Sequence, residues 1–292
     1  MAAAGNLRLV NPRGGRTLAA VSLQVVVNFR VVDECDDWIV VDKPAPLIVH
    51  PANNKPEPTL IGGLERLLAY EVANGACPAI VTRLDRETSG LVLVAKHRAA
   101  ARELGMVFMR REAEKEYLAV VHGWPVAAEW TCEAPILRAG ELGPSPIWVR
   151  QVVHPAGKAC RTRFAVEARF ERAEGRFSLV RCFPETGRMH QLRVHLAHGG
   201  HPIVGDKLYS GNGDEYLEWM ATGWTPELAR RLWLPRHALH AAVLAVPWQG
   251  RRVAWRVDLA GDLQAFVAGA PVAEIADAVL WSRHERPRDM PP

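Results

Sequence analysis

The chain has 292 residues, of which 49% are hydrophobic and 23% charged, and its formal net charge is +4. This composition is typical of a globular protein with one large or two medium domains, and it excludes an intrinsically disordered chain. No apolar run approaches the roughly 20 residues that a membrane-spanning helix needs. The N-terminus also lacks the apolar core of a signal peptide.

Cysteine usage indicates a reducing compartment. The five cysteines are odd in number, widely spaced and without a CxxC pair: Cys35, Cys77, Cys132, Cys160 and Cys182. This pattern disfavours both a disulfide framework and a zinc knuckle. We therefore expect a cytoplasmic protein with no membrane partner.

The basic residues are almost all arginine. Of the 36 Lys and Arg residues only six are Lys. Arginine makes forked contacts to phosphate and stacks on bases, so this skew is compatible with nucleic-acid binding. A bias in genomic base composition explains it equally well, and charge alone does not decide between the two.

The pattern of apolar residues predicts a mixture of strands and helices after a weakly patterned lead-in. Leucines at helical spacing predict a helix over residues 59–71 with Thr59 as its N-cap. Other helices are expected at 97–111, 189–198 and, as two short ones, 214–234. Strands are expected at 23–29, 38–41, 79–81, 91–94, 116–122, 163–168, 177–183, 238–247 and 252–259, with short strands in a long excursion over 125–160.

Strands and helices do not alternate strictly, and hairpins dominate. This favours an α+β fold around a central mixed, mostly antiparallel sheet with flanking helices over a doubly wound parallel sheet. We expect three parts. Residues 1–30 form a short lead-in, 31–270 form one folded domain, and 271–292 form a C-terminal tail.

The segment 79–94 places a polar cluster around Asp85 between two apolar runs. The runs predict buried strands and the Thr-Ser-Gly sequence predicts a turn, so Asp85 is expected on a loop between rigid strands. Catalytic groups often occupy such loops. An ordinary hairpin in which Asp85 caps the turn fits the same pattern, and the segment alone leaves both readings open.

The helix expected at 189–198 carries His190 and Arg193 three residues apart, on one face. The run of histidines from 190 to 201 does not have the HExxH spacing and includes no carboxylate, so we expect no metal there. Arg193 cannot lose its proton and would keep a nearby carboxylate ionised.

The sequence from Asp85 to Thr88 is a near match to the Asp-x-Asp-x-Thr signature of aspartyl-phosphate hydrolases. Glu87 replaces the second aspartate and would shift any magnesium ion, and no clear acidic pair follows downstream. The hydrolase is therefore the less favoured alternative. Both readings agree that a carboxylate nucleophile is plausible at this position.

Taken together, the motifs resemble the RluA family of RNA pseudouridine synthases. The segment RLDRETSG at 83–90 is similar to the family signature, and the other segments follow in the family's order over roughly residues 35–260. They are WIVVDKP at 38–44, VHP at 49–51, KEYLA at 115–119, TGRMHQLRVH at 186–195, GHPIVGDKLY at 200–209 and LHA at 239–241.

The resemblance implies isomerisation of uridine to pseudouridine in structured ribosomal or transfer RNA, by a monomer without cofactor or metal. It implies that Asp85 is the nucleophile, attacking either the sugar or the uracil ring. Tyr117 would stack on the uracil and help remove its C5 proton, and Arg193 would keep Asp85 anionic. The residues implied in substrate binding are Arg83, Thr88, Arg188 and His190. A non-catalytic RNA-binding relative is the competing class.

The chain departs from the family pattern in its N-terminal length and at two positions. Many relatives carry a separate small RNA-binding domain at the N-terminus, whereas residues 1–30 are too few for a full extra domain, so the resemblance implies a catalytic domain at 31–270. Thr82 stands where the family often has histidine, and Cys160 replaces a small alanine, which we interpret as a packing change. The uridine must be swung out of its stack before its glycosidic bond is reached, at a cost of a few kcal/mol. Arginine contacts to phosphate would offset that cost in a salt-dependent manner.

Overall fold

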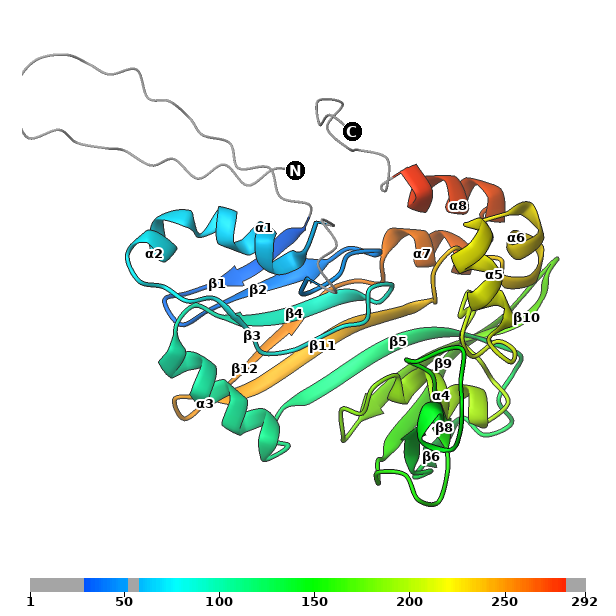
Figure 1. Ribbon diagram of the computed structural model, residues 1–292, viewed down its shortest axis with the longest axis horizontal. Coiled ribbons are helices and arrows are strands. Elements are labelled where there is room, and N and C mark those ends of the chain that lie inside the picture. Colours follow the sequence, from blue (N-terminus) through cyan, green and yellow to red (C-terminus); the bar gives the residue numbers. More distant parts are fainter. Residues whose placement is uncertain (1–28, 52–57, 282–292) are drawn as a thin grey trace, which may run out of the picture.

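The computed structural model describes residues 29–51 and 58–281 (Figure 1). The strand expected at 23–29, apart from its last residue, lies outside the described residues, as do 52–57 and the charged segment from 282 onward. Within the described ranges, no helix has the length and apolar character needed to cross a bilayer.

One mixed sheet forms the centre of the fold. Its strand order is β1-β2-β4-β11-β5-β10-β9-β6, with β3 also paired to β4 and β12 to β11. Neighbouring strands are antiparallel except β4 and β11, which are parallel, so the expected α+β class is confirmed. The bounds are β1 Arg30–Glu34, β2 Trp38–Lys43, β3 Ala79–Ile80, β4 Ser89–Ala95, β5 Glu114–His122, β6 Glu129–Cys132, β9 Thr162–Arg172, β10 Gly175–Pro184, β11 Leu239–Trp248 and β12 Arg251–Arg256.

Strand β2 is buried on both faces because helices cover both sides of this half of the sheet. Ile39 and Val41 pack toward α1 (Leu60–Leu67), whereas Trp38 and Val40 pack toward α3 (Arg98–Met109). Figure 1 shows α1 with α2 (Ala69–Ala73) on one side and α3 on the other. As predicted, the Thr59 hydroxyl caps α1 by accepting a hydrogen bond from Gly62 N at 3.1 Å.

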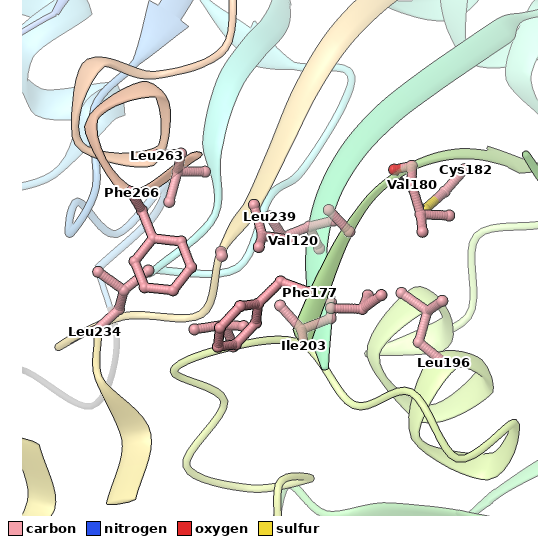
Figure 2. Packing of buried hydrophobic residues seen from close by; sticks show 14 of the residues in the cluster. Val120, Phe177, Val180, Cys182, Leu196, Ile203, Leu234, Leu239, Leu263 and Phe266 are labelled. Carbon is pink, nitrogen blue, oxygen red and sulfur yellow. Dashed lines mark hydrogen bonds between the residues drawn. The ribbon is translucent and has the colours of Figure 1, made fainter. Parts of the chain in front are cut away.

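The other half of the sheet holds the largest apolar core. Phe177 of β10 packs among Val120, Ile203 and Phe266, as Figure 2 shows. The helices of this half are α4 Gln191–His198, α5 Asp214–Thr222, α6 Pro226–Leu232, α7 Gly261–Val267 and α8 Val272–Trp281. Helix α8 lies inside the segment expected to be a tail, and its Ile275 is buried in this core.

The predicted excursion at 125–160 contains β6 and a small separate sheet of β7 (Ile136–Arg138) and β8 (Gln151–Val153). It packs against α4 through an apolar cluster that includes Ile136, Ile147 and Val194. The excursion therefore forms one flank of the helix that carries Arg193.

Gly90 permits the close approach of β4 and β11. Its φ is +110°, and a Cβ at this position would lie 2.3 Å from the Ala241 carbonyl oxygen. Ala241 is also the register partner of Tyr117 on β5. The loop that precedes β4 is therefore placed beside the start of β5, which brings Asp85 and Tyr117 to the same region.

Candidate active site

An open pocket gathers all seven site residues predicted from the sequence. Its wall includes the loop before β4, the start of β5, the end of β10 and the start of α4. Lining residues are Arg83, Leu84, Asp85, Thr88, Lys115, Tyr117, Pro184, Thr186, Gly187, Arg188, His190, Gln191, Leu192, Arg193 and Leu239.

Asp85 presents a carboxylate to this pocket. Its side chain is 32% exposed, and its Oδ2 accepts a hydrogen bond from Arg193 Nη1 at 2.9 Å. His190 Nε2 lies 3.8 Å from the same oxygen. Burial would raise the pKa of Asp85, but His190 and Arg193 outweigh it and hold that pKa below its ordinary value. Asp85 is therefore an ionised carboxylate with one face open to a ligand.

Arg193 is fixed from behind by a second carboxylate. Asp206 is fully buried and accepts hydrogen bonds from Nε at 2.6 Å and Nη2 at 2.8 Å. Burial would lower the pKa of Arg193, but the charge and hydrogen bonds of Asp206 outweigh it and raise that pKa. A guanidinium bound on two edges by carboxylates keeps one orientation, so Nη1 is held toward Asp85.

His190 occupies the N-cap position of α4 with a positive φ of 57°. Burial, together with the charge of Arg193, lowers the pKa of His190 to about 4. The imidazole is therefore neutral at neutral pH, and its charge acts on Asp85 only in the acid range in which Asp85 itself titrates. The sequence predicted that His190 and Arg193 share a face, and the structure places both next to the Asp85 carboxylate.

Tyr117 lies on β5 between β10 and β11. Burial and the negative charge of Asp85 raise the pKa of its hydroxyl. The phenol therefore stays protonated, and its ring contributes an aromatic surface to the pocket. A protonated phenol is a poor base, which favours the stacking role expected for Tyr117 over removal of a proton by a tyrosinate.

Lys43 anchors the Asp85 loop, defined here as residues 81–88. Its side chain is fully buried, and Nζ donates to the carbonyl oxygens of Pro44 at 3.0 Å, Leu47 at 2.9 Å and Arg86 at 3.2 Å. The carbonyl of Arg86 also accepts from Leu47 N at 3.0 Å. These bonds fix the backbone immediately after Asp85. The motif containing Lys43 was noted in the sequence, but its contact with the loop was not foreseen.

The other side of the Asp85 loop is tied to the segment before β11. The Thr88 hydroxyl lies 2.7 Å from His237 Nε2, and the Thr88 side chain is only 2% exposed. Thr88 thus lines the pocket with its hydroxyl engaged by a buried histidine, and its role in substrate binding stays a prediction. Glu87 receives two hydrogen bonds from Lys207 Nζ, at 2.8 and 2.9 Å.

The Gln191 side chain holds the part of the pocket wall formed by residues 186–188. Its Oε1 accepts from Thr186 Oγ1 at 2.7 Å and Arg188 N at 3.0 Å, while its Nε2 donates to Thr162 Oγ1 at 2.9 Å. Arg188 and Arg83 are exposed at the pocket rim. The rim therefore presents two guanidinium groups above a rigid pocket.

Glu87 and His195, side chains that a phosphohydrolase or a metal site would use, are engaged in other contacts. Within residues 29–51 and 58–281, no group of three or more His, Cys, Asp or Glu side chains is placed to hold a metal ion. Glu87, the candidate second acid of a phosphohydrolase, is engaged by Lys207. His195 is buried, with Nδ1 3.0 Å from Thr162 Oγ1 and Nε2 2.9 Å from the Ala134 carbonyl oxygen.

The two residues that depart from the family pattern make local contacts. The Thr82 hydroxyl accepts a hydrogen bond from Leu93 N at 2.8 Å. Cys160 is buried, with Sγ 3.2 Å from the Ala134 carbonyl oxygen and 3.3 Å from His195 Nε2. Burial raises the pKa of the Cys160 thiol, which disfavours a reactive thiolate.

Comparison with solved structures supports the same fold. The protein described as human RNA pseudouridylate synthase domain containing 1 is 26% identical, with a TM-score of 0.61 over 79% of this chain and 83% of its own. The related human protein described as domain containing 4 is 22% identical, with a TM-score of 0.63 over 82% of this chain and 92% of its own. Because the domain containing 4 protein is only 22% identical, its similarity to this chain shows a shared fold and no more.

Sequence comparison identifies the family. The family model for RNA pseudouridylate synthase matches residues 37–198. Ribosomal large subunit pseudouridine synthase D of Escherichia coli strain K12 is 35% identical over 257 residues, 86% of this chain and 74% of the relative. The Nitrosomonas europaea protein of the same name is 34% identical over 244 residues, 82% of this chain and 65% of the relative. The chain belongs to the RNA pseudouridine synthase family, as its sequence motifs indicated, and is an isomerase of that family.

Proposed function

We propose that this protein converts specific uridines in RNA to pseudouridine with Asp85 as the nucleophile. The observation that carries the proposal is an ionised Asp85 held at 2.9 Å by Arg193 in a pocket that also contains Tyr117. A carboxylate must be deprotonated to attack a carbon atom, and the lowered pKa of Asp85 meets that condition. The buried pair of Arg193 and Asp206 keeps the carboxylate oriented before substrate arrives.

The pocket accommodates a nucleotide that has left its stack. Tyr117 supplies a face on which the flipped uracil stacks, and Arg83 and Arg188 at the rim supply phosphate contacts. Because those contacts release counterions, RNA binding weakens as salt increases. Two curated relatives are named for the large ribosomal subunit, so we infer that the substrate is its ribosomal RNA. We place the enzyme in the cytoplasm as a monomer.

Tritium release tests the function. RNA from cells that lack the protein is labelled at uracil C5, and the purified protein should release tritium without added metal and in the presence of a chelator. Asp85→Asn should abolish tritium release, since it removes the attacking charge. Its dissociation constant for RNA should stay within about threefold of that of the unmodified protein, since the shape of the side chain is kept. Asp36→Asn, at an exposed carboxylate between β1 and β2, is the matched control and should react normally.

Other outcomes separate the competing classes. Salt-sensitive RNA binding with no tritium release from any RNA would show a non-catalytic RNA-binding protein. Phosphate release that depends on magnesium and stops with a chelator would show a phosphohydrolase. Full activity of Asp85→Asn would refute the assignment of the nucleophile.

A further inference from the structure

Tyr209 touches both groups that flank the nucleophile. It is 8% exposed and ends the turn that also carries Asp206. Its ring centroid lies 5.0 Å from the guanidinium carbon of Arg193 and 5.7 Å from the ring centroid of His190, which it meets at an interplanar angle of 77°. One aromatic side chain thus meets Arg193 with its face and His190 in a T-shaped contact.

The Tyr209 hydroxyl makes two hydrogen bonds among the described residues. It accepts from the backbone N–H of Gln151 at 3.0 Å, and it lies 2.8 Å from His190 Nδ1. The amide of Gln151 can only donate, which leaves the proton of the hydroxyl available for Nδ1. A neutral imidazole that accepts at Nδ1 carries its proton on Nε2.

We propose that Tyr209 is a positioning residue that fixes His190 as the neutral Nε2–H tautomer, with a hydrogen-bond donor facing Asp85 and the bound nucleotide. The proposal rests on the proposed role of Asp85 as nucleophile, because the donor acts on the Asp85 carboxylate. In the free enzyme Nε2 lies 3.8 Å from Asp85 Oδ2, close enough for a small closure on substrate to complete the hydrogen bond.

The surroundings of His190 keep it neutral. Burial lowers the pKa of His190 to about 4, with the charge of Arg193 acting in the same direction and those of Asp85 and Asp206 opposing it. Burial also raises the pKa of Tyr209, so its hydroxyl keeps the proton that it donates. With both groups neutral, tautomer choice is the remaining variable, and the hydroxyl of Tyr209 decides it.

The same contact links the site to the excursion at 125–160. Gln151 lies on β8, and Tyr209 packs in one apolar cluster with Ile136, Ile147 and Val194. The backbone of β8 thereby orients the hydroxyl that orients His190. The ring of Tyr209 packs in the apolar cluster, whereas its hydroxyl fixes the tautomer of His190. The Tyr209→Phe variant keeps the ring and removes the hydroxyl, so it separates these two contributions.

Nitrogen NMR of the histidine rings reads the tautomer directly. At pH 7 the resonances of His190, identified by their loss in His190→Gln, should show an unprotonated Nδ1 and a protonated Nε2. In Tyr209→Phe, the chemical shift of His190 Nδ1 should move toward the value expected for a mixture of the two neutral tautomers. A protonated Nδ1 in the unmodified protein, or an unchanged His190 signal in Tyr209→Phe, would overturn the proposal.

Kinetics supply a second readout. Tyr209→Phe should lower kcat by about tenfold, the effect of one lost hydrogen bond, with KM for RNA within about twofold. The double variant with His190→Gln should be no slower than His190→Gln alone, whereas a purely structural role would make the two losses multiply. Tyr70→Phe, at a 64% exposed tyrosine on α2, is the control and should leave kcat unchanged.

The NMR result does not depend on turnover, so the two proposals fail separately. If Asp85→Asn retains activity while the tautomer shifts in Tyr209→Phe as predicted, the function assigned to Asp85 is wrong and the tautomer assignment stands. If Asp85→Asn is inactive and the His190 signal does not respond to Tyr209→Phe, the positioning role is wrong.

Discussion

Arg193 joins Asp206 and Asp85 through one guanidinium group. Two of its N–H groups donate to Asp206, at 2.6 and 2.8 Å, and a third donates to Asp85 at 2.9 Å. Asp206 is fully buried, whereas 32% of the Asp85 side chain is exposed. The buried carboxylate therefore fixes the arginine, and the arginine holds the partly exposed Asp85 carboxylate in its charged form.

Arg193→Lys tests whether activity needs the hydrogen bonds of Arg193 to both carboxylates in addition to its positive charge. Lysine keeps one positive charge but cannot donate in the plane to both carboxylates, so Asp85 should lose its fixed orientation. We expect kcat for tritium release to fall on the order of a hundredfold. Arg98→Lys on the exposed face of α3 is the matched control, and a rate for Arg193→Lys within twofold of that control would contradict the account.

Lys43 should make stability rise with pH. Burial, together with the charge of Arg236, lowers the pKa of Lys43 from 10.5 to about 7. Between these values the unfolded chain binds more protons than the folded one, so this residue adds up to about 1.4 kcal/mol of stability per pH unit as pH rises. Below pH 7 both states are protonated, and the contribution no longer changes.

The Lys43→Met variant isolates this effect. It removes the titrating group, so the free energy of unfolding of the unmodified protein minus that of the variant should increase from pH 7 to pH 9. Urea denaturation at pH 7, 8 and 9 measures the difference. A difference that stays constant over this range would show that Lys43 has an ordinary pKa in the folded protein.

Gly90→Ala should be severely destabilising. The φ of +110° is unfavourable for any other residue, and the new Cβ would lie 2.3 Å from the carbonyl oxygen of Ala241. We expect a loss of at least about 3 kcal/mol in the free energy of unfolding, or failure to fold. In Gly105→Ala on α3 the added Cβ has no atom within 4 Å beyond its chain neighbours and the backbone of its own helix. The free energy of unfolding of this variant should instead rise by roughly 0.5–1 kcal/mol. Equal effects of the two changes would refute the close approach of β4 and β11.

Cys160→Ala tests the interpretation of this position as packing. The thiol makes weak contacts with Ala134 and His195, so its removal should change the free energy of unfolding by about 1 kcal/mol. The rate of tritium release should remain within twofold, because the raised pKa keeps the thiol unreactive. A rate loss beyond tenfold would assign Cys160 to the chemistry.

The sequence motifs led to the pocket because its reacting groups lie in short contiguous segments. The prediction placed Asp85, Tyr117 and Arg193 together, and all three line one pocket. The strands of the core were also predictable, since Ile39, Val41, Val92 and Val94 lie in continuous apolar runs.

Other features depend on distant parts of the chain and left no local signal. The polar edge strand β1 was not anticipated, because its pattern lacks a buried face. The order of strands in the sheet is set by long-range pairing, such as β5 between β11 and β10. The support that Asp206, Lys43 and Tyr209 give to the site consists of hydrogen bonds across the fold, and sequence spacing does not encode them.

The proposed reaction is the formation of pseudouridine in RNA through Asp85. The most direct measurement is a map of pseudouridines in total RNA from cells that lack the protein, compared with the same cells supplied with the unmodified protein or with Asp85→Asn. The account predicts that one or more sites in large-subunit ribosomal RNA disappear, return with the unmodified protein and stay absent with Asp85→Asn. An unchanged map, or restoration by Asp85→Asn, would contradict it.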